Sequence, residues 1–398
     1  MLTKYRLYTP GPTSVPEATL AVLARPVHHH RTPEFRATFT SVQKRLQYVF
    51  QTRQNVHVIT GSGTAAFEAG LSSVFAPGSR VLNISNGKFA ERWGQQARTF
   101  GLDCTELKLP YGHHVRPEQL RDELGKLRSS GKVDGVLLVH SETSTATVCD
   151  LAAVAAAVRE AAPEALLVVD GITSIGALPF KMDEWGVDVA VTGSQKALML
   201  PPGLGFVALS ERARQRMHAR TAAPGGIAGP FYLDLRKSEK SLPDGDTPFT
   251  PANTLIEALD VSLQMIEQET LETVWRRTAT VAAAFRSAMT AIGLRLFSRQ
   301  PADSVTAVEY PDGGKGAVSD KAFRGMLKTV HNVHVAGGQG SMEGTLFRVN
   351  HMGYTDAYDA LAVVAAVEHT LAALQHRFEF GAGVSAAHAA LRPLFAAS

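Results

Sequence analysis

The sequence predicts an α/β protein with a large domain, built on a mainly parallel sheet flanked by helices, and a smaller α+β domain at the C-terminal end. Short runs of Val, Leu and Ile alternate with longer stretches of helical periodicity through the first half of the chain. Near-continuous apolar strands separated by helices are typical of a parallel sheet that is covered on both faces. The chain has 398 residues, which is too long for one small core.

The strands of the large domain are predicted from their apolar runs. They cover residues 55–60, 80–85, 135–140, 165–170, 187–192 and 204–210. Helical periodicity fills most of the intervals between them, beginning near residues 64, 89 and 150.

The alternating pattern stops at 223–253, where "APGGIAGP" and "KSEKSLPDGDTPFTPAN" are rich in Pro, Gly and charge. One long helix is predicted over 254–293. The elements predicted after it are strands at 304–310 and 345–350, a helix at 319–331 and an Ala-rich terminal helix from 381.

We therefore expect three parts in the chain. An N-terminal segment (1–20) joins the small domain, the large domain covers 21–269, and the small C-terminal domain covers 270–398.

Composition excludes several classes of protein. The chain is 45% hydrophobic and 19% charged with a net charge of +3, and no basic run is interleaved with aromatic residues, so nucleic acid is not an expected partner. No apolar run reaches membrane-spanning length, and the N-terminus lacks the apolar region of a signal peptide. The two cysteines, Cys104 and Cys149, give no disulfide framework and no metal spacing. We expect a cytoplasmic protein.

The first predicted strand runs into a glycine-containing turn, Gly61 to Ala66, which opens a helix. Free backbone N–H groups and the positive helix end make such a turn an anion site, although a plain strand-to-helix turn would look the same. The turn also fits the dinucleotide pattern G-x-G-x-x-G/A. That pattern expects an acidic residue near the end of the next strand, where Asn83 and Ser85 stand instead, so a monophosphate fits better.

Two ionisable residues follow later strands. Asp170 ends the strand at 165–170, and Lys196 comes 26 residues later, just after the strand at 187–192. Taken alone, Asp170 could cap a helix or pair with an arginine, and Lys196 could lie at the surface. Ligands of open parallel sheets bind beyond the carboxyl ends of the strands, so the two residues and the glycine turn could share one crevice. A phosphate site, a carboxylate and a lysine together match pyridoxal phosphate.

The chain resembles the class V, fold-type I pyridoxal-phosphate aminotransferases, close to their alanine–glyoxylate / serine–pyruvate group. The resemblance extends from "YTPGPTSVP" near the N-terminus to "FRVNHMG" near residue 353. The other matching pieces are "GSGTAAFEA", "NGKFAERW", "HSETSTAT", "VVDGITSIG", "GSQKAL", "PPGLGF", "FTPAN" and "GGQGSMEGTLFRVNHMG".

This resemblance implies roles for ten residues. Lys196 would hold the cofactor as an internal aldimine, and Asp170 would pair with its ring nitrogen. The other implied contacts are Gly63, Thr64 and Gln195 at the phosphate, Phe89 and Ile172 on the two ring faces, Thr143 near the phenolic oxygen, and Arg348 at the substrate α-carboxylate. Thr250 would reach the phosphate of a partner subunit, which implies a homodimer.

The resemblance also implies the reaction. We expect ping-pong transamination between alanine or serine and glyoxylate or pyruvate. Aspartate or ureidoglycine transamination, or a cysteine desulfurase or lyase activity, are alternatives within the class, and an NAD-dependent dehydrogenase is a distant one. Asn350 stands where a small residue is common, which could alter substrate fit. Three adjacent histidines, His28 to His30, lack a ligand pattern, so no metal is expected.

Overall fold

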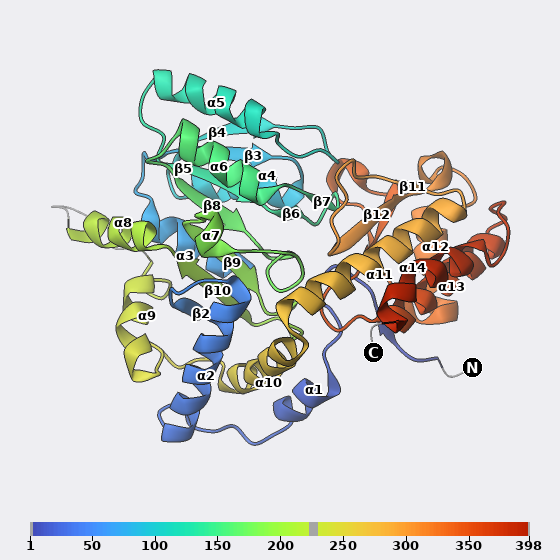
Figure 1. Cartoon of the computed structure of the whole chain (residues 1–398), viewed down its shortest axis with the longest axis horizontal. Helices are drawn as coiled ribbons and strands as arrows, with labels where there is room; N and C mark the ends of the chain where they lie inside the picture. Colours follow the sequence, from blue (N-terminus) through green and yellow to red (C-terminus); the bar gives the residue numbers. More distant parts are fainter. Residues whose placement is uncertain (1–2, 223–229, 397–398) are drawn as a thin grey trace.

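The computed structural model of the protein describes residues 3–222 and 230–396 (Figure 1). Residues 223–229, which belong to the stretch expected to interrupt the strand–helix pattern, lie outside the described residues. Within the described ranges, no helix is both long and apolar enough to cross a lipid bilayer.

A seven-stranded sheet with the order β2-β10-β9-β8-β5-β3-β4 forms the centre of the larger part. Its strands are β2 (Val56–Thr60), β3 (Arg80–Ser85), β4 (Asp103–Lys108), β5 (Gly135–Val139), β8 (Leu166–Asp170), β9 (Val189–Gly193) and β10 (Leu204–Leu209). The neighbouring pairs β9–β8, β8–β5, β5–β3 and β3–β4 are all parallel. The prediction of a mainly parallel sheet is confirmed.

Two strands differ from the sequence expectation. Strand β10 runs antiparallel to both β9 and β2. The segment 194–203 that joins it to β9 is shorter than the crossover of about a dozen or more residues that a parallel pair needs. Strand β4 was not predicted. Its sequence, DCTELK, is largely polar, and it lies at the sheet edge, where it is only partly buried.

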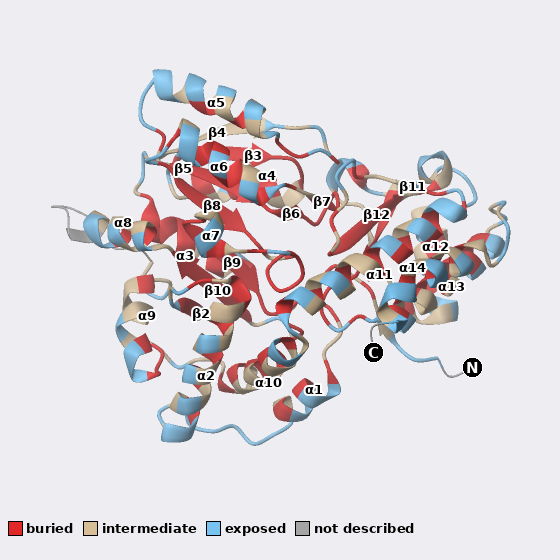
Figure 2. Cartoon of the chain, viewed as in Figure 1, coloured by how far each residue is buried: buried red, intermediate tan, exposed pale blue. Residues whose placement is uncertain are grey.

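Helices cover both faces of this sheet, and successive strand residues point to opposite faces. Leu82 and Leu138 pack in one core with α2 (Pro33–Phe50), α5 (Pro117–Ser129), α6 (Leu151–Ala161) and α10 (Asn253–Glu269). Val81 and Leu137 pack in the other with α3 (Gly63–Val74), α4 (Lys88–Thr99) and α8 (Glu211–Ala222). Figure 2 shows the buried strands between the half-exposed helices.

The C-terminal part has its own sheet and core, at the right of Figure 1. The sheet order is β11-β12-β15-β14, and β12 and β15 are antiparallel. The strands are β11 (Arg295–Leu296), β12 (Val305–Glu309), β14 (Ala336–Gly337) and β15 (Leu346–Asn350), and the helices are α11 (Leu271–Ala291), α12 (Asp320–His331), α13 (Ala357–Ala373) and α14 (Ala382–Phe395).

The N-terminal segment touches both parts. Strand β1 (Arg6–Leu7) pairs in parallel with β13 (Val333–His334) of the C-terminal part. Helix α1 (Glu17–Leu23) instead contacts α10, which belongs to the large sheet.

The prediction of a single long helix over 254–293 is wrong, because two helices, α10 and α11, meet at Thr270. Thr270 has φ 69° and ψ 146°, which no helix residue adopts, and its hydroxyl accepts a hydrogen bond from the Thr273 N–H at the start of α11. Apolar periodicity continues through the break, so it gives no sign of where one helix stops.

Short elements near the sheet complete the frame. The hairpin of β6 (Ser141–Glu142) and β7 (Thr147–Val148) follows β5 directly. The short helices α7 (Met182–Trp185) and α9 (Leu235–Ser241) precede β9 and follow α8, and the 3-10 turns are η1 (Leu242–Asp244), η2 (Pro311–Gly314) and η3 (Gly340–Met342).

Candidate active site

The three strand ends singled out in the sequence meet at one pocket. Strands β2, β8 and β9 end at the same edge of the sheet, since β2 and β9 both run antiparallel to β10 between them. The pocket, with an empty volume of about 630 Å³, is lined by Ser62, Gly63, Thr64, Phe67, Phe89, Arg92, Trp93, Gln96, Val139, Thr143, Asp170, Ile172, Gln195 and Lys196. Eight of the ten candidate residues therefore line it. Thr250 and Arg348 do not.

Lys196 lies in the turn that follows β9, where the Met199 N–H donates to the Lys196 carbonyl at 3.1 Å. Its Nζ donates to the carbonyl of Pro10 at 2.5 Å. Burial lowers the pKa of Lys196 to about 8, while the nearby Asp170 carboxylate acts in the opposite direction. Lys196 therefore loses its proton far more easily than an exposed lysine.

Asp170 is buried at the end of β8, and each of its carboxylate oxygens accepts one hydrogen bond. Oδ1 accepts from the Ile172 N–H at 2.8 Å, and Oδ2 accepts from Nε1 of Trp93 at 3.1 Å. Burial raises the pKa of Asp170 to about 7, and the Ile172 N–H and the charge of Lys196 act against this rise. A cationic N–H in the pocket would stabilise the ionised carboxylate, which is what a protonated ring nitrogen offers.

The cradle formed by the turn between β2 and α3 and by the end of β9 is closely packed at two glycines, Gly63 and Gly193. Ser62 caps α3 by accepting from the Thr64 N–H at 3.3 Å. A Cβ at Gly63 would lie 2.6 Å from Cδ1 of Ile172, and a Cβ at Gly193 would lie 2.9 Å from Oε1 of Gln195. A side chain at either position would therefore displace Ile172 or Gln195.

The Gln195 side chain gives a test of whether a phosphate fits this cradle. Its Oε1 is buried, and no group in the described part of the chain hydrogen-bonds to it. A buried amide without a partner is costly, so a ligand that bonds to it would be stabilised there. An amide donates through its NH2 group, and a 180° flip of the Gln195 amide would exchange the positions of its O and N atoms. With that NH2, the N–H groups at the N-terminus of α3 and the hydroxyl of Thr64, the donor set fits the phosphate of pyridoxal phosphate.

Phe89 and Ile172 line the pocket from different elements, α4 and the loop after β8. The guanidinium of Arg92, one helical turn beyond Phe89, lies 5.1 Å from the centre of the Phe89 ring. The sequence analysis did not identify Arg92 or Trp93. Both belong to the quoted "NGKFAERW", and their spacing of three and four residues from Phe89 puts them on the same side of the helix.

Glu142 is a third residue that the sequence analysis missed. Its buried carboxylate accepts from the Ala90 N–H at 2.8 Å, from the Ser144 N–H at 2.9 Å and from Oγ of Ser144 at 2.6 Å. Burial raises the pKa of Glu142, while these hydrogen bonds lower it. Because Glu142 holds the first turn of α4, it fixes the position from which Phe89 reaches the pocket.

Thr143, in the turn between β6 and β7, connects the pocket to Arg348 on β15. Its hydroxyl is 3.1 Å from that of Thr173, and its carbonyl accepts from Nη1 of Arg348 at 3.0 Å. Nε and Nη2 of Arg348 both donate to the carbonyl of Gly337, at 3.0 and 2.8 Å. A guanidinium has five N–H groups, so two remain available.

Arg348 is 4% exposed, so it is not a surface arginine. Burial lowers the pKa of Arg348 to about 10, which leaves it charged at neutral pH. Asn350, on the same strand, bonds through Nδ2 to the Met352 carbonyl at 2.9 Å and through Oδ1 to the Met352 N–H at 3.1 Å. Its side chain thus holds the turn after β15.

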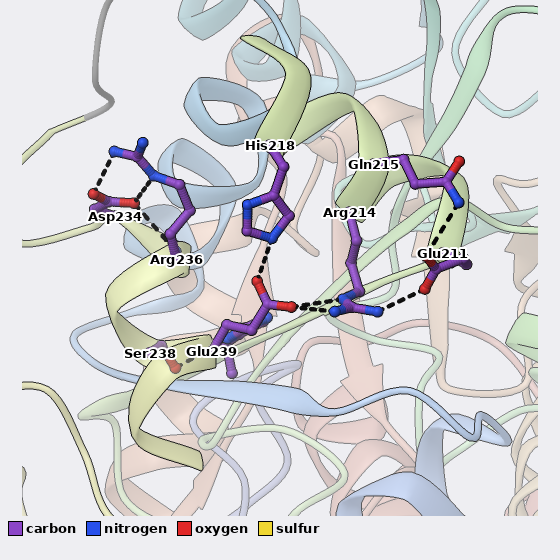
Figure 3. A network of polar contacts seen from close by, with 9 residues as sticks. Glu211, Arg214, Gln215, His218, Asp234, Arg236, Ser238 and Glu239 are labelled. Atoms are coloured by element: carbon purple, nitrogen blue, oxygen red, sulfur yellow. Dashed lines mark hydrogen bonds and ion pairs between the residues drawn. The ribbon is translucent and has the colours of Figure 1, made fainter. Parts of the chain in front are cut away.

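Thr250 lies in a different hollow, lined by residues of β2 and by Tyr232, Leu233 and Phe249. It is exposed. Figure 3 shows how this region is held: Glu239 of α9 accepts from Nε of Arg214 at 2.9 Å and from Nε2 of His218 at 2.8 Å, both on α8. These contacts fasten α9 to α8 and do not reach the pocket.

The three adjacent histidines and the two cysteines lie outside the pocket lining. His28 lies 3.1 Å from Oε1 of Glu257, and among the described residues no group of three or more His, Cys, Asp or Glu could hold a metal ion. Cys104 and Cys149 are free thiols whose pKa burial raises, and neither lines the pocket.

A mainly parallel sheet with a lysine, a carboxylate and a phosphate cradle at its strand ends defines a pyridoxal-phosphate enzyme of fold type I. The sequence profile of the class-V aminotransferases matches residues 17–355, and the chain belongs to this family. It is a pyridoxal-phosphate-dependent aminotransferase.

Three known proteins illustrate the similarity. The chain is 38% identical to the "Soluble hydrogenase 42 kDa subunit" of Anabaena cylindrica, over 96% of this chain and 98% of that protein. It is 32% identical to the serine–glyoxylate aminotransferase of Methylorubrum extorquens, over 97% and 96%. The crystal structure of an aspartate aminotransferase from Thermus thermophilus superposes with a TM-score of 0.84 at 36% identity, covering 93% of this chain and 99% of that one.

Proposed function

We propose that the enzyme transfers the amino group of alanine or serine to glyoxylate or pyruvate. The observation that carries the proposal is that Lys196, Asp170 and the Gly63 cradle line one pocket. The serine–glyoxylate aminotransferase of Methylorubrum extorquens supports the choice of substrates.

We assign the binding of the cofactor to the eight candidate residues that line the pocket. Gly63, Thr64 and Gln195 bind the phosphate, and Asp170 keeps a proton on the ring nitrogen. Phe89 and Ile172 would hold the ring between them, and Thr143 would lie near its phenolic oxygen. Lys196 is the point of covalent attachment.

Pyridoxal phosphate, when bound, supplies an aldehyde that reacts with amines and a ring that withdraws electrons from the substrate's α-carbon. In our proposal Arg348 binds the α-carboxylate through its two remaining N–H groups and so orients the α-hydrogen. Once Lys196 is free of the cofactor, its Nζ takes the proton from the α-carbon. Its depressed pKa of about 8 suits that task, because a base works best when its pKa is near the working pH.

Aspartate is a second candidate donor, and Arg92 is the observation that favours it. Arg92 places another cation on the pocket wall, where a second substrate carboxylate could bind. The aspartate aminotransferase of Thermus thermophilus is in keeping with this reading.

We further propose a cytoplasmic homodimer in which Thr250 serves the partner's phosphate. The exposure of Thr250 and its distance from the pocket of its own chain are what such a role requires. We propose the domain division 1–20, 21–269 and 270–398, which is supported by the separate cores and by the break at Thr270.

The experiment is a screen of half-reactions. The enzyme loaded with pyridoxal phosphate is mixed with each amino acid in turn, and the loss of its visible absorption is followed by stopped flow. Alanine or serine should react at least about tenfold faster than the other amino acids. If aspartate reacted fastest, it would replace alanine and serine as the proposed amino donor. The Arg92→Gln substitution should then slow the half-reaction of aspartate and leave those of the other amino acids unchanged.

A further inference from the structure

A segment from the N-terminus of the chain closes one side of the Lys196 turn. The Thr13 N–H donates to the Gln195 carbonyl at 3.1 Å, and Oγ1 of Thr13 donates to the Lys196 carbonyl at 2.9 Å. Nζ of Lys196 reaches back to the Pro10 carbonyl at 2.5 Å. Both the backbone and the amine of Lys196 are therefore held by this segment.

Gly11 lies directly against the lysine side chain. A Cβ at this position would collide with Nζ and would lie 2.5 Å from Cε and 2.7 Å from Cδ. Gly11 has φ +138°, a backbone conformation that favours glycine. The lysine can occupy its place only because residue 11 has no side chain.

The segment is itself fixed by the C-terminal part of the protein. The Tyr8 N–H donates to the His334 carbonyl and the Asn350 N–H to the Tyr8 carbonyl, both at 2.8 Å. The Tyr8 hydroxyl donates to Oδ1 of Asp359 at 3.1 Å. Asn350 is two residues beyond Arg348 on β15, so the strand that carries the substrate arginine also holds the segment that contacts the lysine.

We propose that Pro10 and Gly11 are positioning residues for Lys196: the Pro10 carbonyl holds the amine by a hydrogen bond, and Gly11 keeps the space it occupies. This inference rests on the proposed role of Lys196. A lysine amine sits on a flexible four-carbon stem, so without a fixed acceptor it would sample many positions. The seat formed by Pro10 and Gly11 limits Nζ to the side of the pocket where it reacts with the cofactor and, once released, with the substrate's α-hydrogen.

The test compares Gly11→Ala with Gly293→Ala. Gly293 also has a positive φ, +80°, but no atom lies within 4 Å of an added Cβ, so it places an alanine at a positive-φ position without the collision. Each protein is mixed with limiting pyridoxal phosphate, samples are reduced with borohydride at successive times, and the fraction of Lys196 carrying the cofactor is measured by peptide mass spectrometry to give the rate of attachment. Equilibrium dialysis gives the total bound cofactor, and thermal unfolding checks the fold.

We expect Gly11→Ala to form the covalent link at least about tenfold more slowly than the wild type, because a misplacement of about 1 Å is enough for such a loss. Total bound cofactor should fall much less, and Gly293→Ala should behave like the wild type. Equal rates of attachment in Gly11→Ala and the wild type would overturn the inference. A wild type in which Lys196 is never modified would instead overturn the proposed function.

Thr13→Val keeps the proposal testable if Gly11→Ala does not fold. The substitution removes the Oγ1 hydrogen bond to the Lys196 carbonyl and keeps the N–H bond to the Gln195 carbonyl. Attachment should slow by about two- to fivefold, and the pH midpoint of the visible absorption should shift, as expected when one hydrogen bond near the lysine is lost. An unchanged attachment rate together with an unchanged pH midpoint of the visible absorption would count against the proposed positioning of Lys196.

Discussion

Replacing Arg348 by lysine should specifically weaken the binding of substrates that carry a carboxylate. Arg348 uses three of its N–H groups to bridge the carbonyls of Gly337 and Thr143, which orients the planar guanidinium and leaves two N–H groups for a ligand. Lysine keeps the positive charge but has no planar fork, so it can neither bridge both carbonyls nor grip a carboxylate with two parallel hydrogen bonds.

The expected loss follows from those two hydrogen bonds. A hydrogen bond to a charged group is worth about 1.5–3 kcal/mol, and lysine can replace one of the two. Losing the other corresponds to about a 10- to 150-fold rise in the KM for both the amino acid and the oxo acid. The kcat should change less, because the carboxylate is bound before and during the chemical step.

The assay measures half-reactions of alanine and of ethylamine, which lacks the carboxylate. The wild type should prefer alanine strongly, and Arg348→Lys should lose most of that preference. Arg286→Lys is the matched control, because Arg286 also donates to a backbone carbonyl, that of Ala302 at 3.1 Å, but its Nη2 pairs with Oδ1 of Asp303 at 2.7 Å and it has no proposed role with the substrate. If Arg348→Lys kept the full preference for alanine, Arg348 would not be the carboxylate-binding residue.

Three further predictions concern the pocket itself. Lys196→Ala should abolish transamination and remove the visible absorption of the loaded enzyme; normal turnover would exclude the assigned role. Gly63→Ala should weaken cofactor binding by at least about tenfold by dialysis, since its Cβ would lie 2.6 Å from Ile172, whereas Gly125→Ala, with open space around it, should bind normally. In the cofactor-free protein, the pKa of Asp170 rises from 3.8 to about 7, so the folded state binds its proton more tightly and the free energy of unfolding should fall as pH rises across that range. Asp170→Asn should flatten this fall in chemical denaturation, and an identical pH dependence in both proteins would show that Asp170 does not cause it.

Much of the fold could be predicted because the strands of the large sheet are buried on both faces. Short runs of Val and Leu predict β5 and β8, whereas the apolar runs of α6 and α13 are rich in Ala and belong to longer helical segments. Strand β4 lies at the edge and needs no apolar run, and the stop of α10 depends on one backbone conformation at Thr270. Neither feature leaves a pattern in the sequence.

The candidate site could be predicted where the chemistry demands a residue type at a strand end, as for Lys196 and Asp170. Residues that act through other residues were missed. Glu142 shapes the start of α4 through backbone N–H groups, and the Pro10 carbonyl belongs to the main chain, so neither has a recognisable signature. Such contacts join segments 52 and 186 residues apart, and only the folded chain brings them together.

The hydrogen bond between Trp93 and Asp170 gives the protein an optical probe of its own chemistry. The chain has three tryptophans, and Trp93 is the one whose indole donates to Asp170, the acid that we assign to the ring nitrogen of the cofactor. Its emission should therefore respond to the arrival of a chromophore in the pocket and to the protonation of Asp170. Cofactor loading can be followed by fluorescence without any label, and Trp93→Phe identifies the part of the signal that comes from this indole.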